Sequence, residues 1–167
     1  MKLSYQFYQR DVLEVAPELL GKKIVILKNN QQFFYRITEV EAYRGEEDLA
    51  CHASKGRTPR TEIMYHEGGY IYVYLIYGMY WMLNIVTGKT DEPQAVLIRG
   101  VEGTSGPGRL TKLLEIDTTF YGESLIKSNR IWLEDDNCTP EYYTTPRIGI
   151  EYAGRNWKEK PWRYILK

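Results

Sequence analysis

Cysteine and histidine are scarce: the 167 residues contain two of each, and this scarcity excludes several kinds of protein. Cys51 and Cys138 are too few for a disulfide framework. Cys51 lies beside His52, but Cys138 is far away along the chain, so the spacing of a zinc site is absent. There is also no P-loop and no GxGxxG motif after a strand. We therefore expect neither a metal nor a cofactor.

Long apolar segments and an excess of charge are missing as well. No apolar run of about 18 residues is free of charge, and the first residues lack the apolar core of a secretory signal. The 22 basic and 22 acidic residues give a formal net charge of zero, which argues against a protein that coats nucleic acid by charge alone. We expect a single monomeric domain over residues 1–167, with no membrane partner. We expect it in the cytoplasm, in a reducing environment.

Tyrosine, in contrast, is abundant, with 15 residues, and several of them lie in one hairpin-like segment. Tyr70–Ile76 is β-branched and aromatic, and Tyr80–Val86 is nearly all apolar, so both are expected strands. Gly78 between them can adopt the positive φ of a tight turn. Because side chains alternate along a strand, the tyrosines at every second position share one face.

The tyrosine row has two interpretations. It fits the core of a β-sandwich, but a buried tyrosine hydroxyl needs a hydrogen-bond partner, which Phe or Leu would not need. Asn84 also lies in the middle of an apolar strand, where an amide without partners costs free energy. Flat aromatic faces with one placed amide instead fit a pocket for a planar, hydrogen-bonding ligand such as a nucleobase.

Charged residues inside two further strands indicate a second group of functional side chains. In the expected strand Phe33–Tyr43, Glu39, Glu41 and Tyr43 lie two apart and so share a face, with Ile37 ahead of them. Such carboxylates face either solvent on an edge strand or a site. Arg99 is a charge inside the apolar strand Gln94–Val101.

The remaining chain predicts an α+β domain: a curved, mostly antiparallel sheet with a few short helices around it. Pro17 is expected to divide the opening helix between Asp11 and Gly21 into two short turns. The other expected elements are a turn over Asn29–Gln32, short helices at Thr61–His66 and Arg109–Ile116, and strands at Lys23–Lys28, Arg130–Leu133, Arg147–Glu151 and Pro161–Leu166.

Several motifs occur in a specific order along the chain. They are Thr38–Tyr43, His52, Arg57–Arg60, Tyr72–Met79, Asn84, the strand with Arg99, and Gly106–Leu110. This ordered set closely resembles the alkyladenine (3-methyladenine) DNA glycosylase family, from the first helix to the last strand. The resemblance implies the same curved, mostly antiparallel α+β fold as the strand count. It also implies a monofunctional base-excision repair enzyme whose partner is double-stranded DNA containing a damaged purine, and hence association with the nucleoid in a bacterium or location in the nucleus of a eukaryote.

The resemblance also implies the residues of the chemical step. Glu41 matches the glutamate that activates a water to attack the sugar C1′, and Arg99 matches an arginine near that water and the sugar phosphate. Glu39 is expected to be structural. No lysine matches a Schiff-base nucleophile, so base release without strand cutting is expected.

The same resemblance implies how the base is held outside the duplex. Tyr43 and Tyr74 match aromatic residues that sandwich the flipped base, and His52 matches a third wall of the pocket. Asn84 matches the amide that disfavours guanine by crowding its 2-amino group. Tyr77, at the hairpin tip, matches the side chain that wedges into the duplex where the base has left.

One segment departs from the family pattern. The family carries a longer insertion between Glu102 and Gly106, where this chain has only Gly103, Thr104 and Ser105. DNA binding on that side is expected to be weaker, and Arg57, Arg60 and Arg109 are the candidate contacts to the DNA backbone.

Two other functions fit parts of the pattern. The aromatic pocket would also suit a non-catalytic reader of damaged or single-stranded DNA, which would not need the Glu41 carboxylate. A carbohydrate hydrolase would use Glu39 and Glu41 as a carboxylate pair, about 7 Å apart on a strand. That chemistry has no use for Tyr77 or Asn84.

Overall fold

Strand β2 (Gln31–Arg44) is the longest element of the sheet and pairs with three other strands. The computed structural model describes all residues, 1–167. The other strands are β1 (Lys23–Lys28), β3 (Ile71–Ile76), β4 (Tyr80–Thr87), β5 (Gln94–Val101), β6 (Thr104–Ser105), β7 (Ile131–Glu134), β8 (Tyr142–Thr145) and β9 (Arg163–Leu166). The α-helices are α1 (Tyr5–Tyr8), α2 (Val12–Leu19), α3 (Pro107–Leu114) and α4 (Arg155–Lys158). Four 3₁₀ helices lie at His52–Lys55, Glu62–Tyr65, Thr118–Phe120 and Glu151–Ala153.

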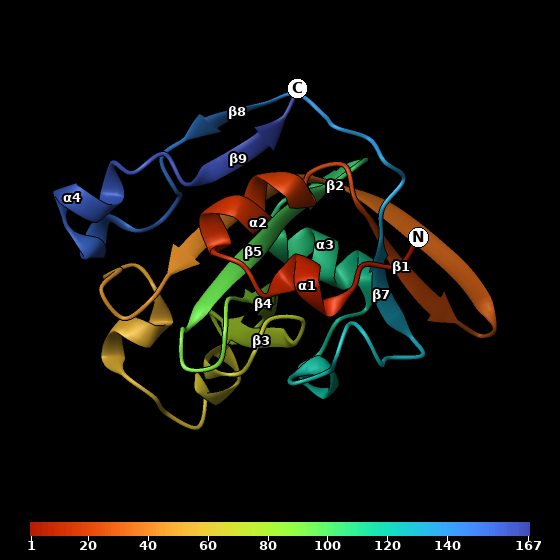
Figure 1. Cartoon of the computed structure of the whole chain (residues 1–167), viewed down its shortest axis with the longest axis horizontal. Helices are drawn as coiled ribbons and strands as arrows, with labels where there is room; N and C mark the ends of the chain where they lie inside the picture. The colour runs from red at the N-terminus through yellow and green to blue at the C-terminus, as the bar shows by residue number, and fades with distance from the viewer.

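The sheet is antiparallel throughout and bends along β2. Its main order is β3-β4-β5-β2-β1-β7, with β6 beside β5 and the β8–β9 hairpin joined to β2 through β9. The first part of β2 pairs with β1 and the second part with β5 and β9 (Figure 1), so one strand belongs to two sections of the sheet. This confirms the α+β fold with a curved, mostly antiparallel sheet. No helix is both long and apolar enough to cross a membrane.

The two faces of the sheet pack against different parts of the protein. One face buries apolar residues of β2 to β5 against α2 and α3 in a core of 27 buried residues, which include Val40, Ile71, Leu83 and Ile98. The opposite face carries Tyr72, Val86 and Ala95, which pack against the two 3₁₀ helices between β2 and β3. Side-chain alternation therefore separates the stabilising core from a second, aromatic face.

Three expectations about single elements are wrong. Helix α2 continues through Pro17, because its apolar face is fully buried and that burial outweighs one lost hydrogen bond. Ile37 points into the main core with Val40, since a β-bulge at Thr38–Glu39 shifts the alternation. Residues Arg147–Glu151 form no strand; Arg147 instead turns inward to a buried salt bridge, and the strand lies earlier, at β8.

The tight turns follow from residues that tolerate positive φ. Asn29 and Asn30, both at positive φ, form a two-residue turn, so β2 begins at Gln31. At the tip of the β3–β4 hairpin, Tyr77 has φ 52° and Gly78 has φ 64°, and Met79 N–H bonds to Ile76 O at 3.1 Å. This type I′ turn presents the Tyr77 side chain to solvent.

Candidate functional site

Two rows of cross-strand neighbours bring distant residues together on the aromatic face. Tyr72 on β3 pairs with Asn84 on β4, Asn84 pairs with Leu97 on β5, and Leu97 pairs with Glu41 on β2. The next row joins Val86 and Ala95 to Tyr43. Strand register thus places Tyr43 and Asn84, two of the expected pocket residues, in neighbouring rows, while Tyr74 of β3 lies opposite Met82.

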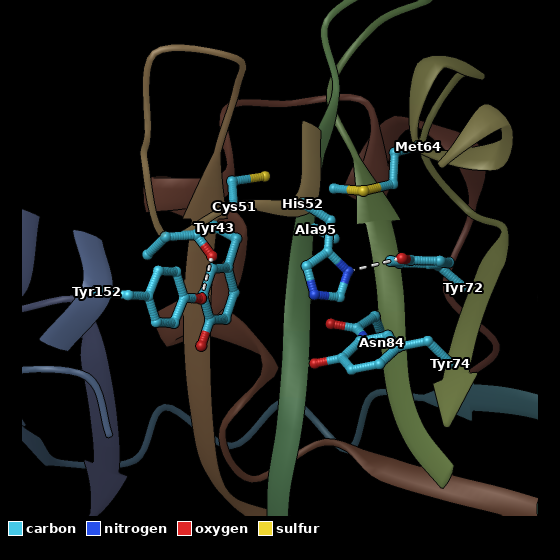
Figure 2. A pocket seen from close by; sticks show the side chains of 10 residues that line it. Tyr43, Cys51, His52, Met64, Tyr72, Tyr74, Asn84, Ala95 and Tyr152 are labelled. Carbon is cyan, nitrogen blue, oxygen red and sulfur yellow. Dashed lines mark hydrogen bonds between the residues drawn. The ribbon is translucent and has the colours of Figure 1, made fainter. Parts of the chain in front are cut away.

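A small cavity with mostly aromatic walls opens on this face. Ten residues line it: Tyr43, Ala50, Cys51, His52, Met64, Tyr72, Tyr74, Asn84, Ala95 and Tyr152. Figure 2 shows Tyr43 and Tyr152 on one side and His52, Tyr72 and Tyr74 on the other. The four expected pocket residues, Tyr43, His52, Tyr74 and Asn84, therefore lie around one cavity.

His52 is a neutral, aromatic part of the wall. Its Nδ1 lies 2.7 Å from the Tyr72 hydroxyl, and its ring centroid lies 4.4 Å from that of Tyr74. Burial, together with the charges of Arg60 and Lys55, lowers the pKa of His52 to about 4. The imidazole is consequently uncharged at neutral pH and offers a flat surface with one free ring nitrogen.

Asn84 keeps most of its hydrogen-bonding capacity. Its side chain is buried, yet the only hydrogen bond it makes is a long one, 3.5 Å from Nδ2 to the Met82 carbonyl. Because buried amides normally have closer partners, this arrangement suits an amide that faces a ligand in the cavity.

Glu41 is completely buried and held by three donors from different parts of the chain. Oε1 accepts the Tyr43 hydroxyl at 2.8 Å and Arg99 Nη1 at 3.4 Å, and Oε2 accepts the Ile148 N–H at 2.7 Å. Burial raises the pKa of the Glu41 carboxyl, while Arg99, the Ile148 N–H, Tyr43 and Arg147 act in the opposite direction. The carboxylate does not line the cavity itself but bonds to Tyr43, which does.

Arg99 joins the two carboxylates of β2. Its Nε donates to Glu39 Oε2 at 3.2 Å and its Nη1 to Glu41, and Glu39 Oε2 also accepts Arg163 Nε at 2.7 Å. Glu39 is therefore bound by two arginines, whereas Glu41 has one arginine and two neutral donors. The two carboxylates are not equivalent, and Glu39 does not line the cavity.

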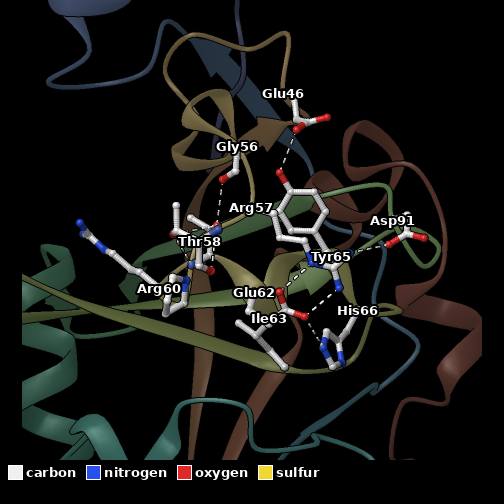
Figure 3. A network of polar contacts seen from close by, with 12 residues as sticks. Glu46, Gly56, Arg57, Thr58, Arg60, Glu62, Ile63, Tyr65, His66 and Asp91 are labelled. Atoms are coloured by element: carbon white, nitrogen blue, oxygen red, sulfur yellow. Dashed lines mark hydrogen bonds and ion pairs between the residues drawn. The ribbon is translucent and has the colours of Figure 1, made fainter.

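The candidate DNA-backbone arginines differ in their surroundings. Arg57 donates to both oxygens of Glu62 at 2.7 Å and to Asp91 at 3.0 Å, so its charge is compensated (Figure 3). Arg60 makes no salt bridge, and its guanidinium lies 5.2 Å from the Tyr74 ring centroid. Arg109 is exposed and likewise free of salt bridges. Arg60 and Lys55 also line a neighbouring groove that shares His52 and Tyr152 with the cavity.

Sequence reasoning missed several members of the site. Tyr152 lines the cavity and donates from its hydroxyl to the Ala50 carbonyl at 3.2 Å. The Ile148 N–H, which bonds to Glu41, comes from a segment that resembled a strand in sequence. A backbone donor carries no residue signature, and only the aromatic character of Tyr152 offered any signal.

Comparison with known proteins identifies relatives over almost the whole chain. A family model described as methylpurine-DNA glycosylase matches residues 6–104 and 102–167. A Psychrobacter cryohalolentis protein named "Putative 3-methyladenine DNA glycosylase" is 45% identical, over 95% of this chain and 89% of its own length. Proteins of the same name from Natranaerobius thermophilus and Legionella pneumophila (strain Corby) are 39% and 43% identical, over 100% and 99% of this chain and 96% and 94% of their own lengths.

These matches also locate a difference in length. The two segments of the family match meet at residues 102–104, where β5 turns tightly into β6. The alignment with the Natranaerobius thermophilus protein spans 191 residues, although this chain has 167. The relative therefore contains residues that this chain lacks.

Proposed function

The chain belongs to the methylpurine-DNA glycosylase family, and we propose that it flips alkylated or deaminated purines out of duplex DNA and hydrolyses their N-glycosidic bond. As a 3-methyladenine DNA glycosylase it is a DNA-repair hydrolase of N-glycosyl bonds. The observation that carries the detailed proposal is the placement of Glu41: a fully buried carboxylate, hydrogen-bonded to a tyrosine of the aromatic pocket.

In the proposed reaction, Glu41 accepts a proton from water as that water attacks C1′ of the flipped nucleotide. A carboxylate whose pKa is raised by burial is a stronger base than one in solution. The Arg99 guanidinium opposes the rise in the pKa of Glu41, and we assign it the contact to the sugar phosphate. N-alkylated purines carry a positive charge and are good leaving groups, so the reaction needs a base for water more than an acid.

The pocket supports the binding of a base outside the duplex. Extrusion of a nucleotide costs a few kcal/mol, and base–aromatic stacking returns roughly 1–3 kcal/mol per base. Tyr43 and Tyr74 provide two aromatic walls and His52 an uncharged third wall. A cationic base would find no repulsion from a protonated imidazole there.

Selectivity and access are assigned to residues at the edges of this pocket. We propose that the Asn84 amide excludes guanine by crowding its 2-amino group, and that Tyr77 at the exposed hairpin tip fills the place of the extruded base. Arg60 and Arg109 are the proposed contacts to the DNA backbone, because their charges are uncompensated; Arg57 would first have to leave Glu62 and Asp91. The protein is proposed to act as a monomer, with its single domain over residues 1–167.

The test is release of base from duplexes that carry 3-methyladenine or 1,N6-ethenoadenine, under single turnover with enzyme in excess. Glu41→Gln keeps the size of the side chain and is expected to bind the lesion duplex but to release base about 10²–10⁴ times more slowly. Glu39→Gln is the matched control, and its rate should fall by no more than about tenfold, because Glu39 touches only the two arginines.

Each other outcome overturns a specific part of the proposal. If neither wild type nor Glu41→Gln releases base while both bind the lesion, the protein is a reader of damage. If Glu39→Gln loses as much activity as Glu41→Gln, the two carboxylates act as a pair. If the wild type binds no DNA, the short turn between β5 and β6 has removed a necessary contact.

A further inference from the structure

Arg147 and Asp48 form the only salt bridge of the structure in which both side chains are fully buried. Arg147 Nη1 donates to Asp48 Oδ2 at 2.6 Å and Nη2 donates to Oδ1 at 3.0 Å. Nη1 also donates to the Ala42 carbonyl at 2.9 Å, but Nε has no hydrogen-bond partner. Neither residue was expected in the site.

A buried pair of this kind is poor evidence for a stabilising role. Desolvation of two charges offsets most of their attraction, and apolar residues of similar volume often stabilise a fold equally well. The unpartnered Nε of Arg147 adds to the cost. The groups that the pair contacts therefore explain its presence better than its contribution to the stability of the fold.

Arg147 contacts the base pocket from behind. Its guanidinium lies 4.9 Å from the ring centroid of Tyr43 and 5.0 Å from that of Trp162. Tyr43 lines the cavity and Arg147 does not, so Arg147 supports the Tyr43 ring from outside the pocket. The next residue, Ile148, donates its N–H to Glu41 Oε2 at 2.7 Å.

Asp48 fixes a second part of the pocket wall. Its carboxylate accepts the Arg44 N–H and the Ala50 N–H, both at 3.0 Å. Ala50 lines the cavity, and its carbonyl accepts the Tyr152 hydroxyl. The salt bridge thus ties the segment after β2 to the segment after β8, and both segments contribute residues to the cavity wall.

We propose that Arg147, through its ion pair with Asp48, is a positioning residue that holds the Ile148 N–H on the Glu41 carboxylate and the Tyr43 ring in its stacking orientation. This inference rests on the proposed role of Glu41 as the base. It assigns a task in catalysis to a side chain that touches neither the flipped base nor the attacking water.

The test replaces both charges, so that no unpaired buried charge remains. In Arg147→Met/Asp48→Asn, the single amide oxygen of the asparagine can still accept the Ala50 N–H, while the Arg44 N–H loses its acceptor. Single-turnover base release from a 3-methyladenine duplex is expected to fall about 10- to 100-fold, while the Kd for that duplex changes less than threefold. Arg130→Met/Glu123→Gln removes a salt bridge between two residues that do not line the cavity and is the matched control, with an unchanged rate expected.

A pH measurement separates positioning from a general structural role. The titratable and charged groups around Glu41 are Arg99, Arg147, Tyr43, Tyr74 and Tyr152. Loss of the Arg147 charge and of the Ile148 hydrogen bond removes two causes that lower the pKa of Glu41. The acid limb of the pH–rate profile, and the Glu41 pKa from NMR titration of the protein without DNA, should both move to higher pH.

The possible results are decisive. If the double variant keeps the wild-type rate and the wild-type pKa of Glu41, the proposal is overturned. If rate and lesion affinity fall equally with no shift of the Glu41 pKa, the pair is merely structural. If the double variant does not fold, Arg147→Lys, which keeps the charge but loses the two-pronged contact, must show the reduced rate. The NMR titration does not require activity. An inactive wild type would therefore refute the proposed function, and the Glu41 pKa of the double variant would still test the positioning role of Arg147.

Discussion

The strained tip of the β3–β4 hairpin gives a prediction in which stability and activity change in opposite directions. Tyr77 has φ 52° and its side chain is 87% exposed, so the fold gains little from the ring and bears the strain of a left-handed residue. That strain is about 1–2 kcal/mol. Replacement by glycine relieves it but adds about 0.4–1 kcal/mol of chain entropy to the unfolded state.

Tyr77→Gly should therefore stabilise the free protein by a net ~0.5–1 kcal/mol. For a protein of this length, 1 kcal/mol corresponds to about 2–4 °C in Tm, so a rise of roughly 1–4 °C is expected. Tyr77→Ala is the matched control: it removes the same ring but keeps a Cβ, and hence the strain, so its Tm should stay near that of the wild type.

Both variants should lose activity on duplex DNA to the same extent. If Tyr77 stacks in the place of the extruded base, its loss costs roughly 1–3 kcal/mol, which is about a 5- to 150-fold lower single-turnover rate. On a single-stranded substrate there is no gap to fill, and the variants should match the wild type.

Thermal unfolding by circular dichroism and single-turnover base release on both substrates check this reasoning. An unchanged duplex rate in Tyr77→Gly would show that Tyr77 is no wedge. A lower Tm in Tyr77→Gly than in Tyr77→Ala would show that the entropy of the unfolded chain outweighs the strain at this position. A lower Tm in Tyr77→Ala than in the wild type would show that the ring, despite its exposure, stabilises the fold.

Three further predictions concern the pocket and the DNA-binding surface. Asn84→Ala should raise release of 7-methylguanine relative to 3-methyladenine by about tenfold, because the crowding amide is gone; an unchanged ratio of the two rates would contradict that role. Arg99→Met should slow base release about tenfold or more. It should also move the acid limb of the pH–rate profile to higher pH, because burial raises the pKa of Glu41 and Arg99 opposes that rise. An acid limb that stays in place, or moves to lower pH, contradicts the assignment. Four exposed cations near the pocket and hairpin make no salt bridge: Lys55, Arg60, Arg109 and Lys112. If each contacts one phosphate, the slope of log Kobs against log salt concentration should be about −3 to −4. A slope of −6 or steeper would reveal a larger interface.

The sequence predicts most strands of this fold because their patterns are local. β1 has the expected bounds, and β3 and β4 differ from the predicted strands by one residue at one end. The antiparallel register then aligns Tyr72, Asn84 and Glu41 without further information. A resemblance to a known family gave these side chains their roles and supported the predicted fold as much as the strand count did.

The features that could not be predicted depend on contacts between distant segments. The bulge at Thr38–Glu39 left only a faint signal in the sequence: the buried residues Ile37, Val40 and Ala42 are spaced by three and then by two. A reader who assumes strict alternation along the strand does not see this change of spacing. The segment after Pro146 alternates like a strand in its sequence. Only the buried partner Asp48, 99 residues away, explains why Arg147 turns inward instead.

The same distinction between local sequence and distant contacts explains how this fold makes Glu41 a general base. The local sequence Thr38–Tyr43 supplies Glu41, its face of the sheet and one donor, the Tyr43 hydroxyl two residues on. The other two donors lie 58 and 107 residues away, on β5 and in the segment after β8. A solvated glutamate has an ordinary pKa and is a weak base, and a buried one without donors would take up a proton. The burial that raises the pKa of Glu41 and the donors that oppose this rise act together only when these three segments meet, so the chemistry of Glu41 belongs to the assembled sheet and not to its motif.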